Sequence, residues 1–382
     1  MQVTVHKAIA GIAPTEWNEL AGHEYPFLRH DFFLAAESGG CVSPASGWTP
    51  RHLTIAEGSG LRAAMPLYEK SHSWGEFVFD WSWAQAYQRA GLDYYPKLVS
   101  AVPFTPAPSR RLLRRDPEDH AAAAALLEAA VSLASEIGCS SLHVLFPTET
   151  ELPLLRKAGL RLRKDCQFHW HNRGYASFDE FLGTFSAAKR KKAKRDRRRA
   201  VEAGITFRRL RGHEIDLDTW KAVYRLISIT FMRRGSLPYF DLEFFTTINA
   251  RLPDNLLVIL AERCNTAVAA AIFFESERVL YGRYWGSDSN YNALHFETCY
   301  YQGIDYCIDT GKQIFEPGTQ GEHKISRGFV PVTTWSAHWL AHPGFFTAIG
   351  DYVDEEARYV DRYIKSVDGH SPYRNDDPQG RT

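Results

Sequence analysis

The segment VILAERCNTAVAAAIFFE, residues 258–275, decides the fold of this chain. Two apolar runs flank a short polar stretch around Asn265, which predicts a β-hairpin. The segment LTIAEGSGLRAAMPLYE, residues 53–69, repeats this pattern around the turn Gly58-Ser59-Gly60. The two segments are separated by roughly 200 residues, which is the length of a domain and too long for a solenoid repeat. They predict a duplicated α/β domain, and the alternative is a chance likeness of two short hairpins.

The two hairpins are followed by similar series of elements. In each half we expect a strand, then a helix, then another strand, as in an α/β unit. The predicted elements of the first half are a strand over 97–102, an Ala-rich helix from Asp116-Pro117 toward Gly138, and a strand over 142–146. Those of the second half are a strand over 279–285, a helix over 294–309 ended by Gly311, and a strand reaching Phe315.

A chain of 382 residues is long enough for two domains. We predict an α/β (α+β) protein with mixed central sheets flanked by helices. The first domain is expected over residues 1–170 and the second over 171–350. Residues 351–382 are expected to form a C-terminal helix and a disordered tail that is rich in Pro, Asp and Gly.

Composition excludes several classes of protein. The formal net charge is zero, so no overall field draws the chain to nucleic acid or membrane. The six cysteines form no Cys-x-x-Cys pair, which argues against a disulfide framework and a zinc site. His169 and His171 lack acidic or Cys partners, so we predict no metal site. Without a signal peptide or a membrane-spanning segment, a cytoplasmic protein is expected.

A dense run of positive charge, KRKKAKRDRRR, occupies residues 189–199. It lies between Ser186, a favourable N-cap, and Gly204, which predicts a basic helix over 187–203. One interpretation is a solvated surface. The other is a cradle for a polyanion such as tRNA, a nucleotide-linked substrate or a membrane surface. The candidate polyanion-binding residues are Lys191, Lys194, Arg195 and Arg198.

The segment FEPGTQGEHKISRGF, residues 315–329, mixes titratable side chains with three glycines. We predict that its loop, residues 316–329, belongs to an active site, because glycines let backbone N–H groups approach a ligand closely. Glu322 could bind or deprotonate an amine, and His323 could relay a proton. Lys324 and Arg327 could hold a carboxylate or phosphate. The alternative is a surface loop with internal ion pairs.

The predicted helix from residue 294 adds further candidates. Glu297 lies in its first turn, where it serves either as a helix-start residue or as a general base. The candidate catalytic residues are Glu297, Glu322, His323 and Lys324. The candidate substrate-binding residues are His295, Tyr284, Trp285, Arg327, Lys97 and Trp83. The chain has no Gly-x-Ser-x-Gly, Walker A or Gly-x-Gly-x-x-Gly motif, so hydrolase, nucleotidase and dehydrogenase functions lack support.

These motifs resemble a bacterial family of predicted N-acyltransferases. The resemblance rests on HFE (295–297), CYYQGI (299–304), the 315–329 segment, YPKL (95–98) and PFTP (103–106). The family is labelled as peptidoglycan biosynthesis or recognition and is similar to Fem-type transferases within the GNAT superfamily. The resemblance implies two tandem GNAT-like domains, the first on the acceptor side. It also implies transfer of an acyl or aminoacyl group to an amine.

One feature departs from the usual GNAT pattern. The Arg/Gln-x-x-Gly-x-Gly/Ala pyrophosphate loop is absent, and Asp288 lies where that loop would precede the second helix. We expect this carboxylate to disfavour a pyrophosphate, which favours a tRNA-borne donor over acyl-CoA. No bound cofactor is expected, and the co-substrate is aminoacyl-tRNA or acyl-CoA.

The resemblance also suggests partners. The acceptor is expected to be a peptidoglycan precursor or a small-molecule amine, and the basic helix suits tRNA through phosphate contacts. The competing hypothesis is a non-catalytic protein that recognises a cell-wall fragment or RNA on the same fold.

Overall fold

The computed structural model describes residues 1–374 except Ser59, Asn290 and Gln320. Ser59 of the first predicted turn, Gln320 of the predicted loop and the end of the predicted tail therefore lie outside the described residues. The chain forms two compact units, one comprising residues 1–165 and 333–361, the other residues 166–332 and the described residues from 362 to 374. It passes between them within strands β9 (Arg161–His171) and β15 (Val330–Leu340) and within helix α12 (Pro343–Asp368).

This division differs from the linear one expected from the sequence. Residues 333–361 belong to the first unit rather than to the second unit or a separate tail. The reason is strand pairing, because Ser336–Leu340 of β15 lies antiparallel to Ser141–Leu145. Pairing over such a distance in sequence leaves no local signal in the residues themselves.

The first unit contains two sheets. Their strand orders are β1-β3-β4-β7 and β15-β8-β6-β5-β2. The elements are β1 (Val3–His6), α1 (Pro14–Ala21), α2 (His30–Ser38), β2 (Trp48–Pro50), β3 (His52–Glu57), β4 (Gly60–Met65), β5 (Tyr68–Lys70), α3 (Trp81–Arg89), β6 (Lys97–Ser100), β7 (Leu113–Arg114), α4 (His120–Glu136), β8 (Ser141–Leu145) and α5 (Leu152–Lys157).

The predicted hairpin and the strand–helix–strand series are present in this unit. β3 pairs antiparallel with β4, and β6 pairs parallel with β8 after the crossover helix α4. The start of α4 differs from the prediction, because Asp119, rather than Asp116, caps the helix by accepting the N–H of Ala122. The alanines of α4 pack against alternate side chains of β6 and β8, which makes this face the core of the unit.

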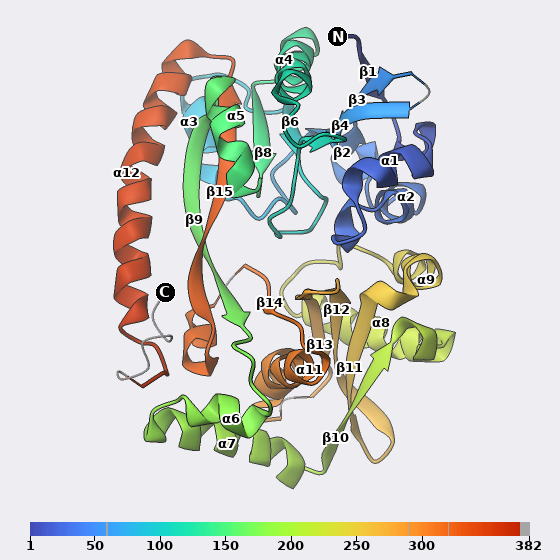
Figure 1. Ribbon diagram of the computed structural model, residues 1–382, viewed down its shortest axis with the longest axis vertical. Coiled ribbons are helices and arrows are strands. Elements are labelled where there is room, and N and C mark those ends of the chain that lie inside the picture. Colours follow the sequence, from blue (N-terminus) through green and yellow to red (C-terminus); the bar gives the residue numbers. More distant parts are fainter. Residues whose placement is uncertain (59, 290, 320, 375–382) are drawn as a thin grey trace. The chain divides into compact units, whose positions relative to one another are not determined.

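The second unit contains one sheet with strand order β10-β11-β12-β13-β14-β9. Its elements are α6 (Phe178–Gly183), α7 (Ala187–Glu202), β10 (Ile205–Arg211), α8 (Leu217–Met232), α9 (Leu242–Arg251), β11 (Leu256–Arg263), β12 (Thr266–Glu275), β13 (Val279–Ser287), α10 (Leu294–Phe296), the π-helix η7 (Glu297–Tyr301), α11 (Gln302–Thr310), β14 (Ile314–Glu316) and the 3-10 helix η8 (Glu322–Arg327). Figure 1 shows α8 and α11 beside this sheet.

Alternation along the strands sends side chains to both faces of this sheet. Leu257 and Ile259 of β11 pack with Ile304 and Cys307 of α11. Gly286 of β13 carries no side chain because the backbone of α8 lies directly over it, 2.2 Å from the position of a Cβ atom. The two helices therefore cover different faces, as the continuous apolar run of a doubly covered strand predicts.

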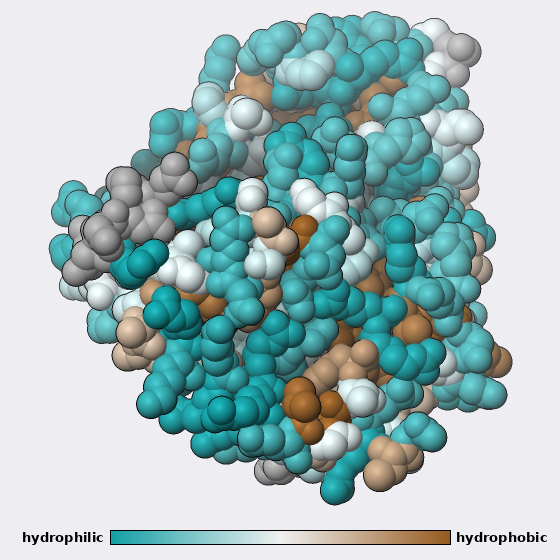
Figure 2. All heavy atoms as spheres, turned by 60° about the horizontal axis from the view of Figure 1, so that its bottom comes forward, coloured by the Kyte–Doolittle hydropathy of each residue, from teal (hydrophilic) through white to brown (hydrophobic). Residues whose placement is uncertain are grey.

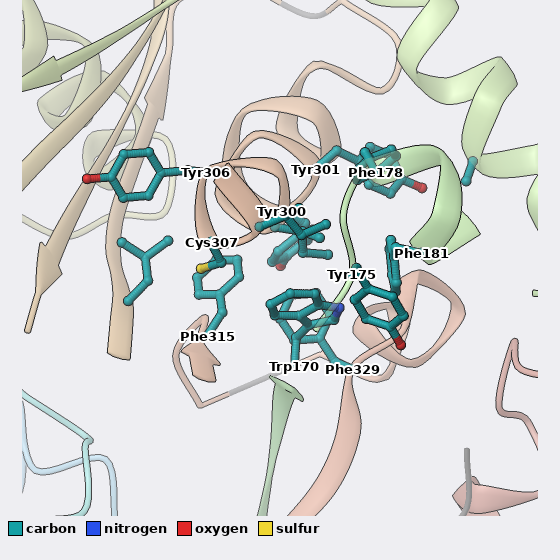
Figure 3. Close-up of a cluster of buried hydrophobic side chains, with 14 of the residues drawn as sticks. Trp170, Tyr175, Phe178, Phe181, Tyr300, Tyr301, Tyr306, Cys307, Phe315 and Phe329 are labelled. Carbon is teal, nitrogen blue, oxygen red and sulfur yellow. The ribbon is translucent and has the colours of Figure 1, made fainter. Parts of the chain in front are cut away.

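Aromatic rings fill the core beneath the candidate loop (Figure 3). The ring of Phe329 lies 5.4 Å from those of both Tyr300 and Phe315. Trp170 of β9 packs against Phe181 of α6 at 5.7 Å. Phe315 and Phe329, the two ends of the 315–329 segment, are thus packed with Tyr300 of the helix that carries Glu297. This packing anchors both ends of the loop between them.

Candidate active site

The site lies where two parallel strands of the second unit part. β13 and β14 pair from Val279↔Ile314 to Tyr281↔Glu316, and no further pair follows. A β-bulge between Ile272 and Phe273 of β12 leaves Arg283 as the extra residue of β13 at this point. The chain after Glu316 stays close to β13 because Gly282 lacks a side chain, and a Cβ there would lie 3.3 Å from Pro317.

Glu316 ends β14 with a buried carboxyl group. Its Oε2 atom makes no hydrogen bond to any residue that the structure describes. Burial raises the pKa of Glu316 to about 7, and the nearby Arg283 opposes this rise. A carboxyl group with a pKa near neutrality can accept a proton in a reaction at physiological pH.

Lys324 on η8 is also buried, with 1% of its surface exposed. Its Nζ atom donates to the Gly318 carbonyl at 2.6 Å. Burial, followed by Arg283, lowers the pKa of Lys324 to about 7, and Cys299 opposes the change. These surroundings suit the catalytic role predicted for Lys324, because a buried lysine readily exchanges its proton near pH 7.

Two imidazoles lie near this loop. The rings of His295 and His323 are 6.0 Å apart, and Tyr300 Oη lies 2.9 Å from His323 Nε2. Burial, followed by His323 and Arg327, lowers the pKa of His295 to about 4. Partial burial, followed by Arg327 and Lys324, lowers the pKa of His323. Both rings are therefore expected to be neutral at pH 7 and able to accept hydrogen bonds.

Glu297 is buried in the π-helix η7, and, as in Glu316, its Oε2 atom makes no hydrogen bond to any residue that the structure describes. Its Oε1 atom accepts from Arg197 Nε at 3.2 Å and from Gln302 Nε2 at 2.8 Å. Burial raises the pKa of Glu297, and Arg197 opposes the rise. These contacts favour the structural role considered for Glu297, in which it fastens α7 to the helix, over a role as the base.

We expect Glu297→Gln to retain most of the transfer activity that the protein shows. The Gln side chain preserves the shape, while weakening the contact to Arg197 lowers the free energy of unfolding by about 1–3 kcal/mol. Initial rates and thermal unfolding measured on the same preparation test this. A loss of rate above about 100-fold at unchanged stability would instead identify Glu297 as the base.

Glu322, the other predicted carboxylate, lies on the outside of η8. It is exposed, and its Oε1 atom accepts a hydrogen bond from Tyr363 Oη at 2.9 Å. Arg327 is almost fully buried, and its guanidinium lies 3.4 Å above the ring of Phe296. The structure therefore brings Lys324, His323, His295 and Arg327 together on one side of the unit and leaves Glu322 at the surface.

A pocket of about 210 Å³ lies where β13 ends and α10 begins. It is lined by Thr230, Arg233, Arg234, Trp285, Ser287, Ser289, Tyr291, Leu294 and His295. Asp288 does not line it, because Arg225 holds that carboxylate at 3.1 Å. The expectation that Asp288 disfavours a pyrophosphate stays a prediction, and the lining of the pocket offers two guanidinium groups and several hydroxyl groups.

The other predicted binding residues have different surroundings. Trp285 packs edge-on against His295 at 5.2 Å, whereas Tyr284 is buried 5.5 Å from Phe245. In the first unit, Lys97 is fully buried and forms ion pairs with Glu76 at 2.8 Å and with Asp80. Trp83 is also buried, edge-on to His338 at 4.8 Å. Tyr284, Lys97 and Trp83 are thus enclosed in the cores of their own units.

The basic helix is present as α7, one residue shorter than predicted. Nine of its sixteen residues are Lys or Arg. The predicted polyanion-binding residues Lys191, Lys194, Arg195 and Arg198 are exposed. Figure 2 shows that hydrophilic side chains predominate on the face of the second unit that includes this helix.

Two residues of the site, Glu316 and Arg283, were not among the predicted site residues. Glu316 stands in the loop singled out from the sequence, but nothing in its neighbourhood in the sequence indicates that it is buried. The position of Arg283 depends on a bulge that appears only when β12 and β13 pair. The only available signal was a glycine near each residue, Gly282 within β13 and Gly318 after the end of β14.

Several solved structures have the same fold. A crystal structure of FemX aligns with a TM-score of 0.55 and 12% identity, covering 92% of this chain and 100% of that one. The C-terminal domain of a putative lysylphosphatidylglycerol synthetase from Agrobacterium fabrum aligns with a TM-score of 0.56 and 9% identity, covering 91% and 97%. At these identities the likeness concerns the fold alone. It confirms the predicted α/β class.

Comparison with curated protein sequences finds no significant match. A family model described as FemAB-like, peptidoglycan biosynthesis/recognition, matches residues 8–375. Among the residues that the structure describes, no helix combines the length and the apolar character needed to cross a membrane. The description of the family relates it to peptidoglycan biosynthesis or recognition. The chain belongs to the FemAB-like family.

Proposed function

We propose that this protein transfers an aminoacyl or acyl group from a phosphate-bearing donor to an amine acceptor, such as a peptidoglycan precursor or a small-molecule amine. The donor is aminoacyl-tRNA or acyl-CoA. The single observation that carries the proposal is that a buried carboxyl group at the end of β14, Glu316, and a buried amine bonded to the Gly318 carbonyl, Lys324, both lie near Arg283. Both have pKa values of about 7.

The proposed step uses both groups. The acceptor nitrogen attacks the carbonyl carbon of the donor ester or thioester, a C–N bond forms, and the C–O or C–S bond breaks. Glu316 accepts the proton that the attacking amine loses and returns it to the leaving oxygen or sulfur. Lys324, in its protonated form, and backbone N–H groups of the glycine-rich loop stabilise the negative charge on the carbonyl oxygen. The reaction therefore needs no reactant other than the donor and the acceptor.

The donor's phosphate fits the pocket beside this site. Arg233 fixes one wall by donating to the carbonyls of Ser287 and Asp288 at 3.0 and 2.9 Å. Arg234 is exposed and forms no ion pair with any residue that the structure describes, so its charge is available to a ligand. The outward cations of α7 offer a second contact that only a long polyanion such as tRNA can use, which supports tRNA as the donor.

A donor assay tests the proposal directly. Labelled aminoacyl-tRNA and acyl-CoA are each incubated with the purified protein and a panel of amines that includes peptidoglycan precursors, and amide formation is followed by mass spectrometry. Amide formed from either donor supports transfer and identifies the donor. No amide with any donor, together with tight binding of RNA or a cell-wall fragment, supports the non-catalytic alternative and overturns the proposal.

We expect Arg234→Ala to raise KM for the donor about 10-fold and to leave kcat unchanged, because the lost contact binds the ground state and the transition state equally. Lys221→Ala is the matched control, since Lys221 is an exposed cation of α8, the helix that ends just before Arg234, and it pairs with Asp218. Steady-state kinetics with varied donor measure both constants. An unchanged KM in Arg234→Ala, or an equal change in the control, contradicts a phosphate site in this pocket.

A further inference from the structure

The helix α7 has two different faces. Lys191, Lys192 and Arg195 point outward and have no ion pair among residues 1–374 as described. Ala193, Asp196 and Ala200 are buried on the opposite face. Asp196 is the one carboxylate in the run of cations from 189 to 199, and it faces inward. The helix therefore presents charge to a ligand on one side and contacts its own unit on the other.

The inward carboxylate reaches the candidate loop. Asp196 Oδ2 lies 3.6 Å from Arg327 Nη2, and both side chains are buried. Arg327 Nη1 also donates to the main-chain carbonyl of His323, and its guanidinium covers the ring of Phe296. Asp196 thus helps to fix the position of Arg327. Arg327 in turn contacts η8, which carries Lys324, and Phe296, the last residue before η7.

The next residue, Arg197, reaches the other side of the site. Its Nε atom lies 3.2 Å from Glu297 Oε1 in η7, and its Nη2 atom lies 3.1 Å from Asp305 Oδ2 in α11. The guanidinium also stacks 4.1 Å from the ring of Phe178. Two consecutive residues of α7 therefore hold the two segments, η8 and η7, whose side chains His323 and Tyr300 are hydrogen-bonded to each other.

We infer that Asp196 and Arg197 are positioning residues that couple the binding of a polyanion on the outward face of α7 to the order of η7 and η8. The inference deepens the proposed function, because it rests on these segments forming the transfer site. We take the polyanion to be an RNA phosphodiester chain, since its successive phosphates match the outward cations Lys191, Lys192 and Arg195, which span just over one turn of α7.

The coupling has a simple physical origin. Nine basic side chains on one sixteen-residue helix repel each other, and like charges three or four residues apart destabilise a helix. A bound phosphodiester chain neutralises these charges and so stabilises the helical conformation of α7. The inward contacts of Asp196 and Arg197 then hold η7 and η8 more tightly, which shifts these segments toward a single conformation.

Hydrogen exchange tests the inference without a transfer reaction. The full-length protein is exposed to deuterated buffer with and without an RNA minihelix that carries no amino acid. For the wild type, we expect the RNA to slow exchange about fivefold or more across residues 294–301 and 322–328. Exchange in α9, which packs against α8, serves as the internal reference.

Three variants separate the two faces of α7. Asp196→Asn and, separately, Arg197→Lys keep the outward cations, so we expect RNA affinity within about fivefold of wild type but no slowing of exchange in the two segments. The triple variant Lys191→Gln, Lys192→Gln, Arg195→Gln has the opposite expected behaviour. Its RNA binding weakens, the dependence of log K on log salt loses about one unit per cation removed, and exchange of the two segments without RNA becomes slower, because fewer like charges remain on α7.

Each outcome decides the inference. Equal RNA-induced slowing in wild type and both inward variants overturns it, as does weaker RNA binding in the inward variants than in the triple variant. Thermal unfolding checks that the inward variants are folded. If Asp196→Asn is not folded, Arg197→Lys, which keeps the positive charge, provides the test. If RNA slows exchange as expected but no donor yields an amide, the proposed function fails while the coupling stands.

Discussion

Glu316→Gln is expected to lower kcat by about 10²- to 10⁴-fold, because the variant lacks the group that takes the proton from the attacking amine. In the wild type, the rise in rate on the acid side of the pH profile should follow the ionisation of the Glu316 carboxyl, whose pKa is about 7. The variant should lose this rise. Initial rates from pH 5.5 to 9 with saturating donor and acceptor measure both effects.

The same substitution is expected to stabilise the protein at alkaline pH. The pKa of Glu316 is raised from 4.5 to about 7 in the fold, so the carboxyl group binds its proton more tightly when folded. Its contribution to stability is therefore fully present below about pH 4.5 and is lost as pH rises through 7. The loss is about 3 kcal/mol. Relative to wild type, Glu316→Gln should gain stability across this window, as measured by denaturant unfolding.

The control for this prediction is Glu322→Gln. Glu322 stands in the same loop but is exposed and bonded to Tyr363, so its loss should change kcat less than about threefold. A large loss of activity in Glu322→Gln with normal activity in Glu316→Gln would show that the exposed carboxylate, which the sequence singled out, is the base after all.

Lys324→Met is expected to lower kcat by about 10²- to 10³-fold, because it removes a donor aimed at the developing oxyanion. In the wild type the protonated form of Lys324 is lost above its pKa of about 7, so the rate should fall at higher pH. Together with Glu316, this gives a narrow bell-shaped profile near neutrality. Lys365→Met, which removes an exposed lysine of the same unit, is the matched control.

Stability should respond to Lys324 with the opposite sign to Glu316. The pKa of Lys324 is lowered from 10.5 to about 7 in the fold. Its contribution to stability is therefore present above about pH 10.5 and is lost as pH falls through 7. Lys324→Met should thus be more stable than wild type at pH 6, and the difference should shrink toward pH 10. An activity loss accompanied by a loss of stability at pH 6 would indicate misfolding rather than missing chemistry.

Much of the local structure could be predicted from the sequence. The hairpins over 53–69 and 258–275, the basic helix and the end of the second-half helix at Gly311 all follow from short-range patterns of apolar residues and glycines. The resemblance to the family extended this to the tandem GNAT-like fold. The loop over 316–329 was also recognised as unusual, because flexibility and titratable side chains are properties of the residues themselves.

What the tertiary structure alone decided is which acidic residue has the properties of a base. Glu297, Glu316 and Glu322 are indistinguishable as residue types within this part of the chain. Their pKa values depend on burial and on partners distant in sequence, such as Arg197, which is a hundred residues away from Glu297. The assignment of residues 333–361 to the first unit has the same origin, because strand pairing between distant segments depends on the whole packed core rather than on any local pattern.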